Sequence, residues 1–242
     1  MRYKCLVSYD GTNFHGFQTQ QELRTVQKEI EDVLFIIMKK PIVIHCSGRT
    51  DTGVHAIGQV IHFDCDIDMG NWNMQNAINS RMSKDIYIRS VEKVDDRFHA
   101  RVDAIKKEYH YIIDFGEFNP LLRNYRYYCR YRNVDRELME QAAKLYIGEH
   151  DFRSYTKNKK KENTIREIFS IDFVWDLDLL TIKIVGSGFL HNMVRILVAM
   201  WLEAARGKYS LEDLKAITEQ KNRVFAPKIA PANGLYLYKV YY

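Results

Sequence analysis

Residues 42–63 run Ile-Val-Ile-His-Cys-Ser-Gly-Arg-Thr-Asp-Thr-Gly-Val-His-Ala-Ile-Gly-Gln-Val-Ile-His-Phe. The apolar start, 42–44, and the alternating end, 59–63, predict two strands. Between them, the glycines and small hydroxyl residues of 47–56 favour a sharp turn. A loop held between two strands is a usual place for catalytic side chains. The stretch therefore predicts a strand-loop-strand unit that presents Asp51 beside Arg49; the alternative is that Asp51 only bonds its own turn.

The sequence on either side of this unit completes one α/β half. Residues 4–9 alternate as a strand, and Thr25 can cap a helix that places Val26, Ile30, Val33, Leu34 and Ile37 on one face. A further helix is predicted over 71–82 and a strand over 86–94. We expect this N-terminal half, which carries the Asp51 loop, to span residues 1–104.

Residues 105–242 repeat the same pattern of elements with a different sequence. Strands are predicted over 109–115, 168–174, 180–185 and 235–241, and helices over 138–147 and 190–206, with another beginning at Ser210. Asp135 can cap the first of these helices and Gly148 can close it. No Gly/Ser-rich spacer separates the two halves, so we expect them to share one continuous sheet. Strands mixed with helices that pack on one side indicate an α+β fold with a cleft between the halves.

Composition and targeting signals limit the function classes. No segment has the continuous apolar length of a membrane span, and the alternating N-terminal residues lack a signal-peptide core. We therefore expect a cytoplasmic protein without membrane contact, whose four cysteines are reduced. His55, His62 and Cys65 are close in sequence, but no second ligand pair accompanies them, so we expect no metal. No dinucleotide-binding or phosphate-loop pattern predicts a nucleotide cofactor.

Basic and aromatic residues cluster in the middle of the chain, which has a formal net charge of +5. Lys106 and Lys107 precede a Tyr-His-Tyr segment, and the run from Arg123 through Arg126 to residue 132 combines arginines with tyrosines and contains no acidic residue. Basic groups pair with phosphates and aromatic faces stack on unpaired bases, so the clusters indicate binding to looped RNA. The alternative is a solvated charged face. The lysines at 159–161 either contact phosphate in the same way or only aid solubility.

Three short segments carry the most specific pattern, together with shorter ones that extend along nearly the whole chain. The three are Gly-Arg-Thr-Asp at 48–51, Lys-Glu-Tyr-His-Tyr at 107–111 and Gly-Ser-Gly-Phe-Leu-His-Asn-Met-Val-Arg at 186–195. In this order they resemble the TruA family of tRNA pseudouridine synthases. The resemblance also includes Tyr-Asp-Gly-Thr at 9–12, Arg-Phe-His-Ala-Arg at 97–101, His-Asp-Phe at 150–152 and Gly-Leu-Tyr-Leu at 234–237.

The resemblance implies isomerisation of uridine to pseudouridine at positions 38 to 40 of the tRNA anticodon stem-loop, without a cofactor. It also implies a homodimer and the pseudouridine synthase fold, in which two RRM-like (ferredoxin-like) halves share a mainly antiparallel sheet with a central active-site cleft. The reaction breaks a C–N glycosidic bond, rotates the uracil and forms a C–C bond to the same sugar carbon. A carboxylate can act as nucleophile at such a carbon, as in glycosidases.

The resemblance also assigns roles to individual residues. Asp51 matches the catalytic aspartate, Tyr109 the active-site tyrosine that stacks on the target base, and Arg195 the arginine that keeps the aspartate ionised. One helical turn before Arg195, His191 is expected on the same polar face. Arg49 resembles the arginine that helps to hold the flipped nucleotide. The pocket floor is expected to be formed by Leu235.

Some positions depart from the family pattern. Phe17 and Thr52 stand where the family usually has Trp and Ala, and Ala199 and Trp201 stand where smaller residues are commoner. These departures remove no reacting group, but they leave open a paralogue that acts on another RNA. Two further functions stay compatible with the sequence: a non-catalytic RNA-binding or chaperone protein, and a nucleosidase that releases free base.

Overall fold

The structure is a computed structural model that describes residues 1–158 and 160–242. The chain divides into two compact units, Met1–Ile105 with Tyr236–Tyr242, and Lys106–Leu235. Both units combine helices with mainly antiparallel strands, so the predicted α+β class is confirmed. The two units are described separately below.

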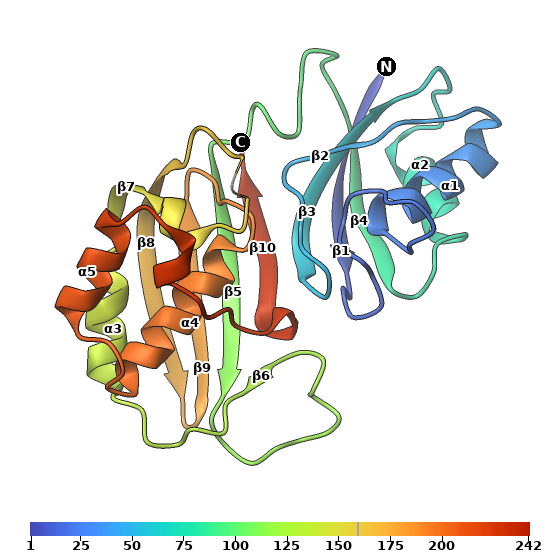
Figure 1. Ribbon diagram of the computed structural model, residues 1–242. Coiled ribbons are helices and arrows are strands. Elements are labelled where there is room, and N and C mark those ends of the chain that lie inside the picture. The colour runs from blue at the N-terminus through green and yellow to red at the C-terminus, as the bar shows by residue number, and fades with distance from the viewer. Residues whose placement is uncertain (159) are drawn as a thin grey trace. The chain divides into compact units, whose positions relative to one another are not determined.

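The first unit is a sheet whose strands follow the spatial order β4-β1-β3-β10 (Figure 1). The antiparallel strands are β1 (Arg2–Tyr9), β3 (His55–Asp64) and β4 (Ile86–Val94), and the short β2 (His45–Cys46) pairs with β3. The C-terminal strand β10 (Leu235–Tyr241) joins β3 in parallel, with Tyr236 opposite His55. Strand β10 is the strand farthest from β3 along the sequence, yet the two strands are neighbours in the sheet.

Two helices, α1 (Val26–Met38) and α2 (Asn71–Asn79), belong to this unit. Thr25 caps α1 as predicted, because its hydroxyl accepts a hydrogen bond from the backbone N–H of Lys28. The apolar stripe of α1 is buried, and the alternate residues of β1 from Tyr3 to Tyr9 are buried as well. These two sets form the core of the unit.

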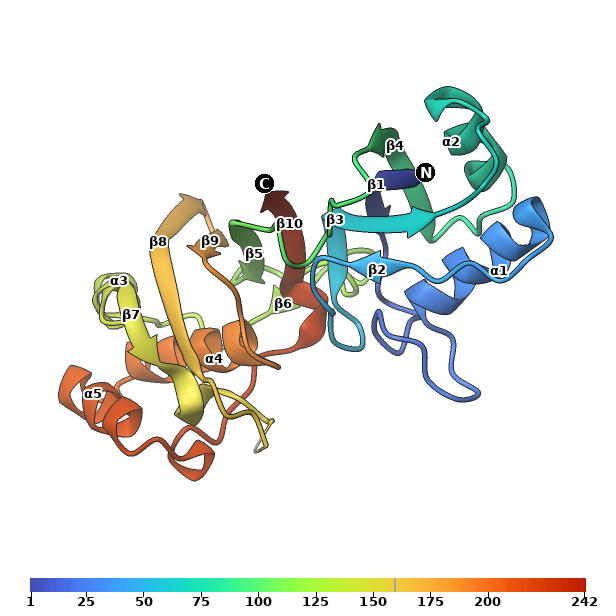
Figure 2. The ribbon, with the colours of Figure 1, turned by 90° about the horizontal axis from the view of Figure 1, so that it is seen from above.

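The second unit has the strand order β5-β9-β8-β7 (Figure 2). Its antiparallel strands are β5 (Lys106–Asp114), β9 (Leu179–Gly186), β8 (Ile165–Asp176) and β7 (Gly148–Asp151), and the short β6 (Tyr127–Tyr128) pairs in parallel with β5. Its helices are α3 (Arg136–Lys144), α4 (Met193–Ala205) and α5 (Leu211–Glu219), with 3₁₀ turns η1 (Phe152–Tyr155), η2 (Arg223–Phe225) and η3 (Ala232–Gly234).

Helix α4 forms the centre of the second unit's core. Every residue of α4 except Arg195 is buried. The helix begins at Met193 rather than at residue 190, because Asn192 adopts a left-handed conformation with φ of 62° and so interrupts the helical backbone. Arg195 is therefore the one residue of α4 that is not fully enclosed by the protein.

Two other expected boundaries were wrong. The apolar run 42–44 is not a strand, although Ile42 and Ile44 are buried, because the backbone N–H of Ile44 donates to Oε1 of Glu31 in α1 rather than to a neighbouring strand. Gly148 does not close α3, which ends at Lys144; with φ of 100° it begins β7. In both places a long-range partner decided the backbone conformation.

Candidate active site

The loop of residues 47–54 connects β2 to β3 and carries Asp51. The backbone N–H of Val54 donates to the carbonyl of Asp51 at 3.1 Å, and Gly53 has a positive φ of 77°. These features form a tight turn. Residues with a Cβ rarely adopt the positive φ that Gly53 has in it. Asp51 is half-buried, whereas Arg49 and Thr52 are exposed. The turn thus places the carboxylate between two solvent-facing side chains.

A network of buried polar side chains holds the start of this loop. The hydroxyls of Tyr9 and Thr50 are 2.7 Å apart, and the carboxamide of Gln59 accepts from the Ser47 hydroxyl and donates to the Gly48 carbonyl, both at 2.8 Å. Tyr9, Ser47, Thr50 and Gln59 are all buried. Burial raises the pKa of the Tyr9 phenol, so it remains a neutral hydrogen-bonding group. The loop therefore starts from a rigid polar base rather than from a flexible surface turn.

The segment of residues 10–17 holds the other side of the loop. The N–H of Phe17 donates to the Thr50 carbonyl at 3.1 Å, and the N–H of Gly53 donates to the Phe14 carbonyl at 3.3 Å. Nδ1 of His55 accepts from the N–H of Gly11 at 3.0 Å. Phe17, which stands where the family resemblance implies a Trp, is buried and packs against the Tyr9 ring. The loop is thus held on both sides within the first unit.

Gly16 provides a test of this support. Its φ is +87°, and a Cβ built there would lie 2.8 Å from the Thr50 carbonyl oxygen. We expect Gly16→Ala to destabilise the protein by about 2–4 kcal/mol and to lower activity by at least about tenfold, because Thr50 must move and takes Asp51 with it. Chemical denaturation and a turnover assay measure the two effects.

Gly70 is the matched control for Gly16. Its φ is +74°, and no atom lies within 4 Å of the position of its Cβ. Gly70→Ala therefore isolates the backbone cost of the positive φ, which at a ψ of 156° is about 1–3 kcal/mol, without disturbing the loop. Equal losses of activity in both variants would contradict the proposed support of the loop by residues 10–17.

A cluster of histidine rings lies beside β3 in the same unit. His62, which is buried, stacks on His45 at a centroid distance of 4.9 Å and meets His99 edge-on at 4.7 Å. Burial and the neighbouring charge of Arg2 lower the pKa of His62 to about 4, and its Nδ1 accepts a hydrogen bond from the N–H of Ala100. The ring is therefore neutral in the folded protein at pH 7.

His62 makes the free energy of unfolding depend on pH. The folded-state pKa lies below the ordinary value of about 6.5, so the unfolded chain binds the proton first as the pH falls, and stability is lost between about pH 6.5 and pH 4. We expect the wild type to lose about 2 kcal/mol more than His62→Gln between pH 7 and pH 5, measured by urea denaturation. The exposed His15→Gln is the control and should follow the wild type. Equal losses in the wild type and in His62→Gln would contradict the prediction.

Arg195 is anchored within the second unit by two reciprocal bonds to one residue. Its Nε donates to the Ala230 carbonyl at 2.8 Å, and the N–H of Ala230 donates to the Arg195 carbonyl at 3.0 Å. The guanidinium is therefore held at the edge of a buried helix. Its predicted ion pair with Asp51 stays a prediction.

The segment of residues 230–235 connects Arg195 with three other predicted residues, Arg123, Arg126 and Leu235. The Tyr111 hydroxyl donates to the Pro231 carbonyl at 2.7 Å, and Nδ2 of Asn233 donates to the carbonyls of Arg123 and Arg126 at 2.6 and 2.7 Å. A Cβ at Gly234 would lie 2.7 Å from the Ile112 carbonyl oxygen, so this segment approaches β5 closely. Leu235 follows directly and is buried. These six residues thus connect helix α4, strand β5 and the basic loop of residues 123–132.

Tyr109 and His191 lie elsewhere in the same unit. Tyr109 sits on β5 opposite Ile184, is 7% exposed and meets the Phe189 ring edge-on at 5.1 Å. His191 is exposed and lies just before α4, with its carbonyl accepting from the Thr156 hydroxyl. Phe189, which follows the Gly-Ser-Gly segment, therefore lies against the strand that carries Tyr109.

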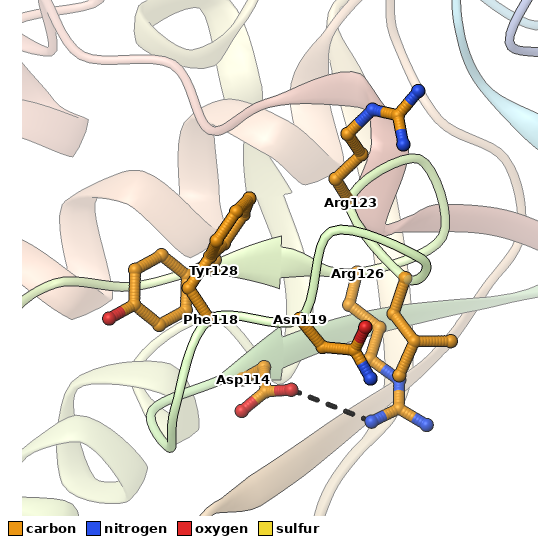
Figure 3. Close-up of a pocket in the computed structure, with 7 residues that line it drawn as sticks. Asp114, Phe118, Asn119, Arg123, Arg126 and Tyr128 are labelled. Carbon is orange, nitrogen blue, oxygen red and sulfur yellow. Dashed lines mark hydrogen bonds and ion pairs between the residues drawn. The ribbon is translucent and has the colours of Figure 1, made fainter.

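The predicted RNA-binding residues differ in the contacts that their side chains make within the protein. Arg126 pairs with Asp114 at 3.5 Å, and Nη1 of Arg123 donates to the Pro120 carbonyl. Both line a small pocket with Phe118 and Tyr128, and their guanidinium groups point in different directions (Figure 3). Lys106 and Lys107 are half-buried at the start of β5. Lys159 lies outside the described residues.

Two groups of supporting residues had no signal specific enough to be identified from the sequence. Gln59 and Ser47 looked like ordinary strand and turn residues, and Asn233 looked like a loop residue. The available clue was a Gln in an otherwise apolar strand, because a polar side chain that becomes buried there needs a hydrogen-bonding partner.

Among the described residues, no cluster of three or more His, Cys, Asp or Glu side chains could hold a metal ion. None of the described helices has the length and apolar character required to span a membrane.

Comparisons with known proteins found a matching family model, sequence relatives and solved structures. The model of the tRNA pseudouridine synthase family matches residues 6–103 and 142–242. The tRNA pseudouridine synthase A of Anoxybacillus flavithermus is 44% identical over 243 residues, covering 100% of this chain and 98% of the relative, and that of Geobacillus sp. is 45% identical over 244 residues, covering 100% and 98%. The solved archaeal box H/ACA sRNP Nop10-Cbf5 complex has a TM-score of 0.37 and 10% identity, covering 96% of this chain and 59% of that chain.

Proposed function

The chain belongs to the tRNA pseudouridine synthase family, and from this premise we propose that it isomerises uridines 38 to 40 of the tRNA anticodon stem-loop with Asp51 as nucleophile. The family makes it an isomerase that forms pseudouridine in tRNA. The choice of uridines and the roles of individual residues are our proposal.

The observation that carries the role of Asp51 is the rigid setting of its loop. Catalytic groups act best when the surrounding structure holds them in place before the substrate binds. Thr50, next to Asp51, is fixed through its hydroxyl by Tyr9 and through its carbonyl by Phe17. A surface turn whose Asp only stabilised its own backbone would not need two buried supports. This difference favours a functional carboxylate.

The proposed reaction begins when the Asp51 carboxylate attacks C1′ of the ribose and the C–N glycosidic bond breaks, leaving the uracil as an anion. The uracil rotates, its C5 forms the new bond to C1′, and the ester to Asp51 breaks. The proton on C5 then leaves to solvent while N1 takes up a proton, so the product has the same atoms as the substrate. In the alternative route, Asp51 removes the 2′ proton and a glycal forms.

The other residues have supporting roles in this proposal. The Arg195 guanidinium keeps Asp51 ionised, and Tyr109 stacks on the uracil while it rotates. Leu235 and His191 border the base, and Arg49 grips the backbone of the extruded nucleotide, which costs a few kcal/mol to unstack. The positive side chains at 106, 107, 123 and 126 contact phosphates along the stem-loop.

We further propose that the protein is a cytoplasmic homodimer, since its tRNA substrate is cytoplasmic and the family resemblance implies two subunits. Sedimentation equilibrium at micromolar concentration should give twice the chain mass of 28.7 kDa. A monomer at that concentration would contradict the dimer while leaving the catalytic proposal untouched.

The experiment that tests the reaction follows the proton on C5. An anticodon stem-loop labelled with tritium at uridine C5 should release the label into water when purified protein is added. Mapping pseudouridines in tRNA from cells with and without the protein then identifies the positions. Retention of the label by every anticodon stem-loop tested would contradict the proposed substrate.

A further inference from the structure

Two apolar side chains are exposed at η2, although the backbone beneath them is firmly held. Val224 is 73% exposed and Phe225 is 47% exposed. The side chain of Asn222 caps the turn by accepting from the N–H of Val224, and its own N–H donates to the Ser154 hydroxyl at 2.9 Å. Ala226, which follows, is fully buried. The backbone that carries Phe225 is thus fixed before a ligand binds. The entropy cost of ordering this segment on binding is therefore small.

The chain segment that carries this pair is basic. From Lys221 to the C-terminal residue the sequence contains no Asp or Glu. Within this stretch Lys228 is exposed and interacts electrostatically with Glu203, and Arg223 uses its Nη2 to hold the carbonyls of Pro227 and Lys228. Lys221 is paired with Asp151 at 3.3 Å. An exposed aromatic ring in basic surroundings has the composition of a surface that stacks on bases and follows a phosphate backbone.

The neighbouring turn η1 contacts η2. The N–H of Asn222 donates to the hydroxyl of Ser154 in η1. Three residues after Ser154, Lys157 is exposed, and its N–H donates to the His191 carbonyl. A further exposed lysine therefore lies near the start of α4.

The position of this surface relative to Arg195 indicates which part of the substrate it meets. Ala230, which is bonded to Arg195, lies five residues after Phe225. Five residues span at most about 17 Å, so Phe225 is within a few nucleotides of any uridine held at Arg195.

We propose that Phe225, with Val224 and Lys228, forms an auxiliary RNA-binding surface on which an unpaired base adjacent to the target uridine stacks. The proposal rests on the proposed function, because it assumes an RNA substrate with unpaired bases near the reacting one. A protein partner is disfavoured because such interfaces are depleted in lysine at their centre.

The test compares substitutions at Phe225 for binding to an unlabelled anticodon stem-loop. Phe225→Ala should weaken binding about tenfold at physiological salt, and Phe225→Leu should weaken it nearly as much, since Leu keeps apolar area but cannot stack. Phe225→Tyr should retain wild-type affinity. Lys228→Gln should reduce the slope of log affinity against log salt by about one. Phe35→Ala is the matched control, because Phe35 is 51% exposed on α1 and has no proposed role.

The outcomes separate this proposal from the proposed function. Wild-type affinity in Phe225→Ala, full affinity in Phe225→Leu, or an equal loss in Phe35→Ala would each overturn the stacking role. A change in sedimentation of Phe225→Ala with unchanged RNA affinity would overturn it in favour of a protein contact. Failure of the wild type to release tritium from C5 would instead count against the proposed function. Circular dichroism confirms that each variant is folded.

Discussion

Asp51→Asn is expected to lower the rate of pseudouridine formation by about 10⁴-fold or more, because the amide cannot attack C1′ and carries no charge. The side chain keeps its size and can still accept and donate hydrogen bonds, so the loop should keep its shape. The bonds that fix the loop run through Tyr9, Thr50 and Gln59 and do not require the carboxylate. Tritium release and RNA affinity, measured on the same preparation, separate loss of chemistry from loss of binding.

Thr52→Ala is the control for Asp51→Asn. Thr52 is exposed in the same turn, and the substitution restores the residue that the family resemblance implies at this position. We expect its rate to remain within about threefold of wild type, because no contact that supports the loop involves its side chain. Tritium release by Asp51→Asn at the native rate would remove Asp51 from the mechanism. Loss of activity in both variants with weakened RNA binding would point to a structural role of the turn.

Arg195→Ala is expected to reduce the rate about 10²- to 10³-fold, because the proposed mechanism gives its guanidinium the role of stabilising the negative charge of the nucleophile. Arg195→Lys should recover only part of the rate, because an ammonium cannot bond the Ala230 carbonyl and a second group in the same fork geometry. Tritium release at saturating RNA measures the rate of each variant.

Arg136→Ala controls for the structural part of the effect. Nη2 of Arg136 donates to the Leu177 carbonyl at 3.1 Å, so this variant also removes an arginine–carbonyl bond from the second unit. It should cost about 1 kcal/mol of stability and leave the rate within about threefold of wild type. Equal rate losses in Arg195→Ala and Arg136→Ala would contradict the proposed ion pair and leave Arg195 a positioning residue for residues 230–235.

Local signals predicted most elements of the fold. Thr25, Asp135 and Ser210 each cap a helix as expected, because a cap depends on a hydroxyl or carboxylate and a backbone N–H only three residues away. The alternating pattern of 86–94 predicted β4 with the bounds that the structure has. The run 42–44 and Gly148 failed because a distant partner, Glu31 in one case and β8 in the other, takes over the backbone.

The candidate site was predicted less evenly. The family resemblance was confirmed, and it had selected Asp51, Tyr109 and Arg195 from the short motifs around them. Their supporting residues were not predictable. Tyr9 and Gln59 meet across more than forty residues of sequence, and Asn233 reaches the carbonyls of the basic loop across more than one hundred. Partners at such separations leave no local pattern, since any polar residue of suitable length could have served.

By itself, the sequence determined the chemistry that is available to this protein: a carboxylate between two small residues in a tight loop, a tyrosine on an alternating strand and an arginine in an otherwise apolar helix. Periodicity and capping depend on neighbours within a few residues, so they survive in the sequence alone. Only the tertiary structure decided what holds these groups. Burying a polar side chain requires a hydrogen-bonding partner, and folding supplied it from distant segments, with Tyr9 and Gln59 beneath Thr50 and Gly48, and Ala230 beside Arg195.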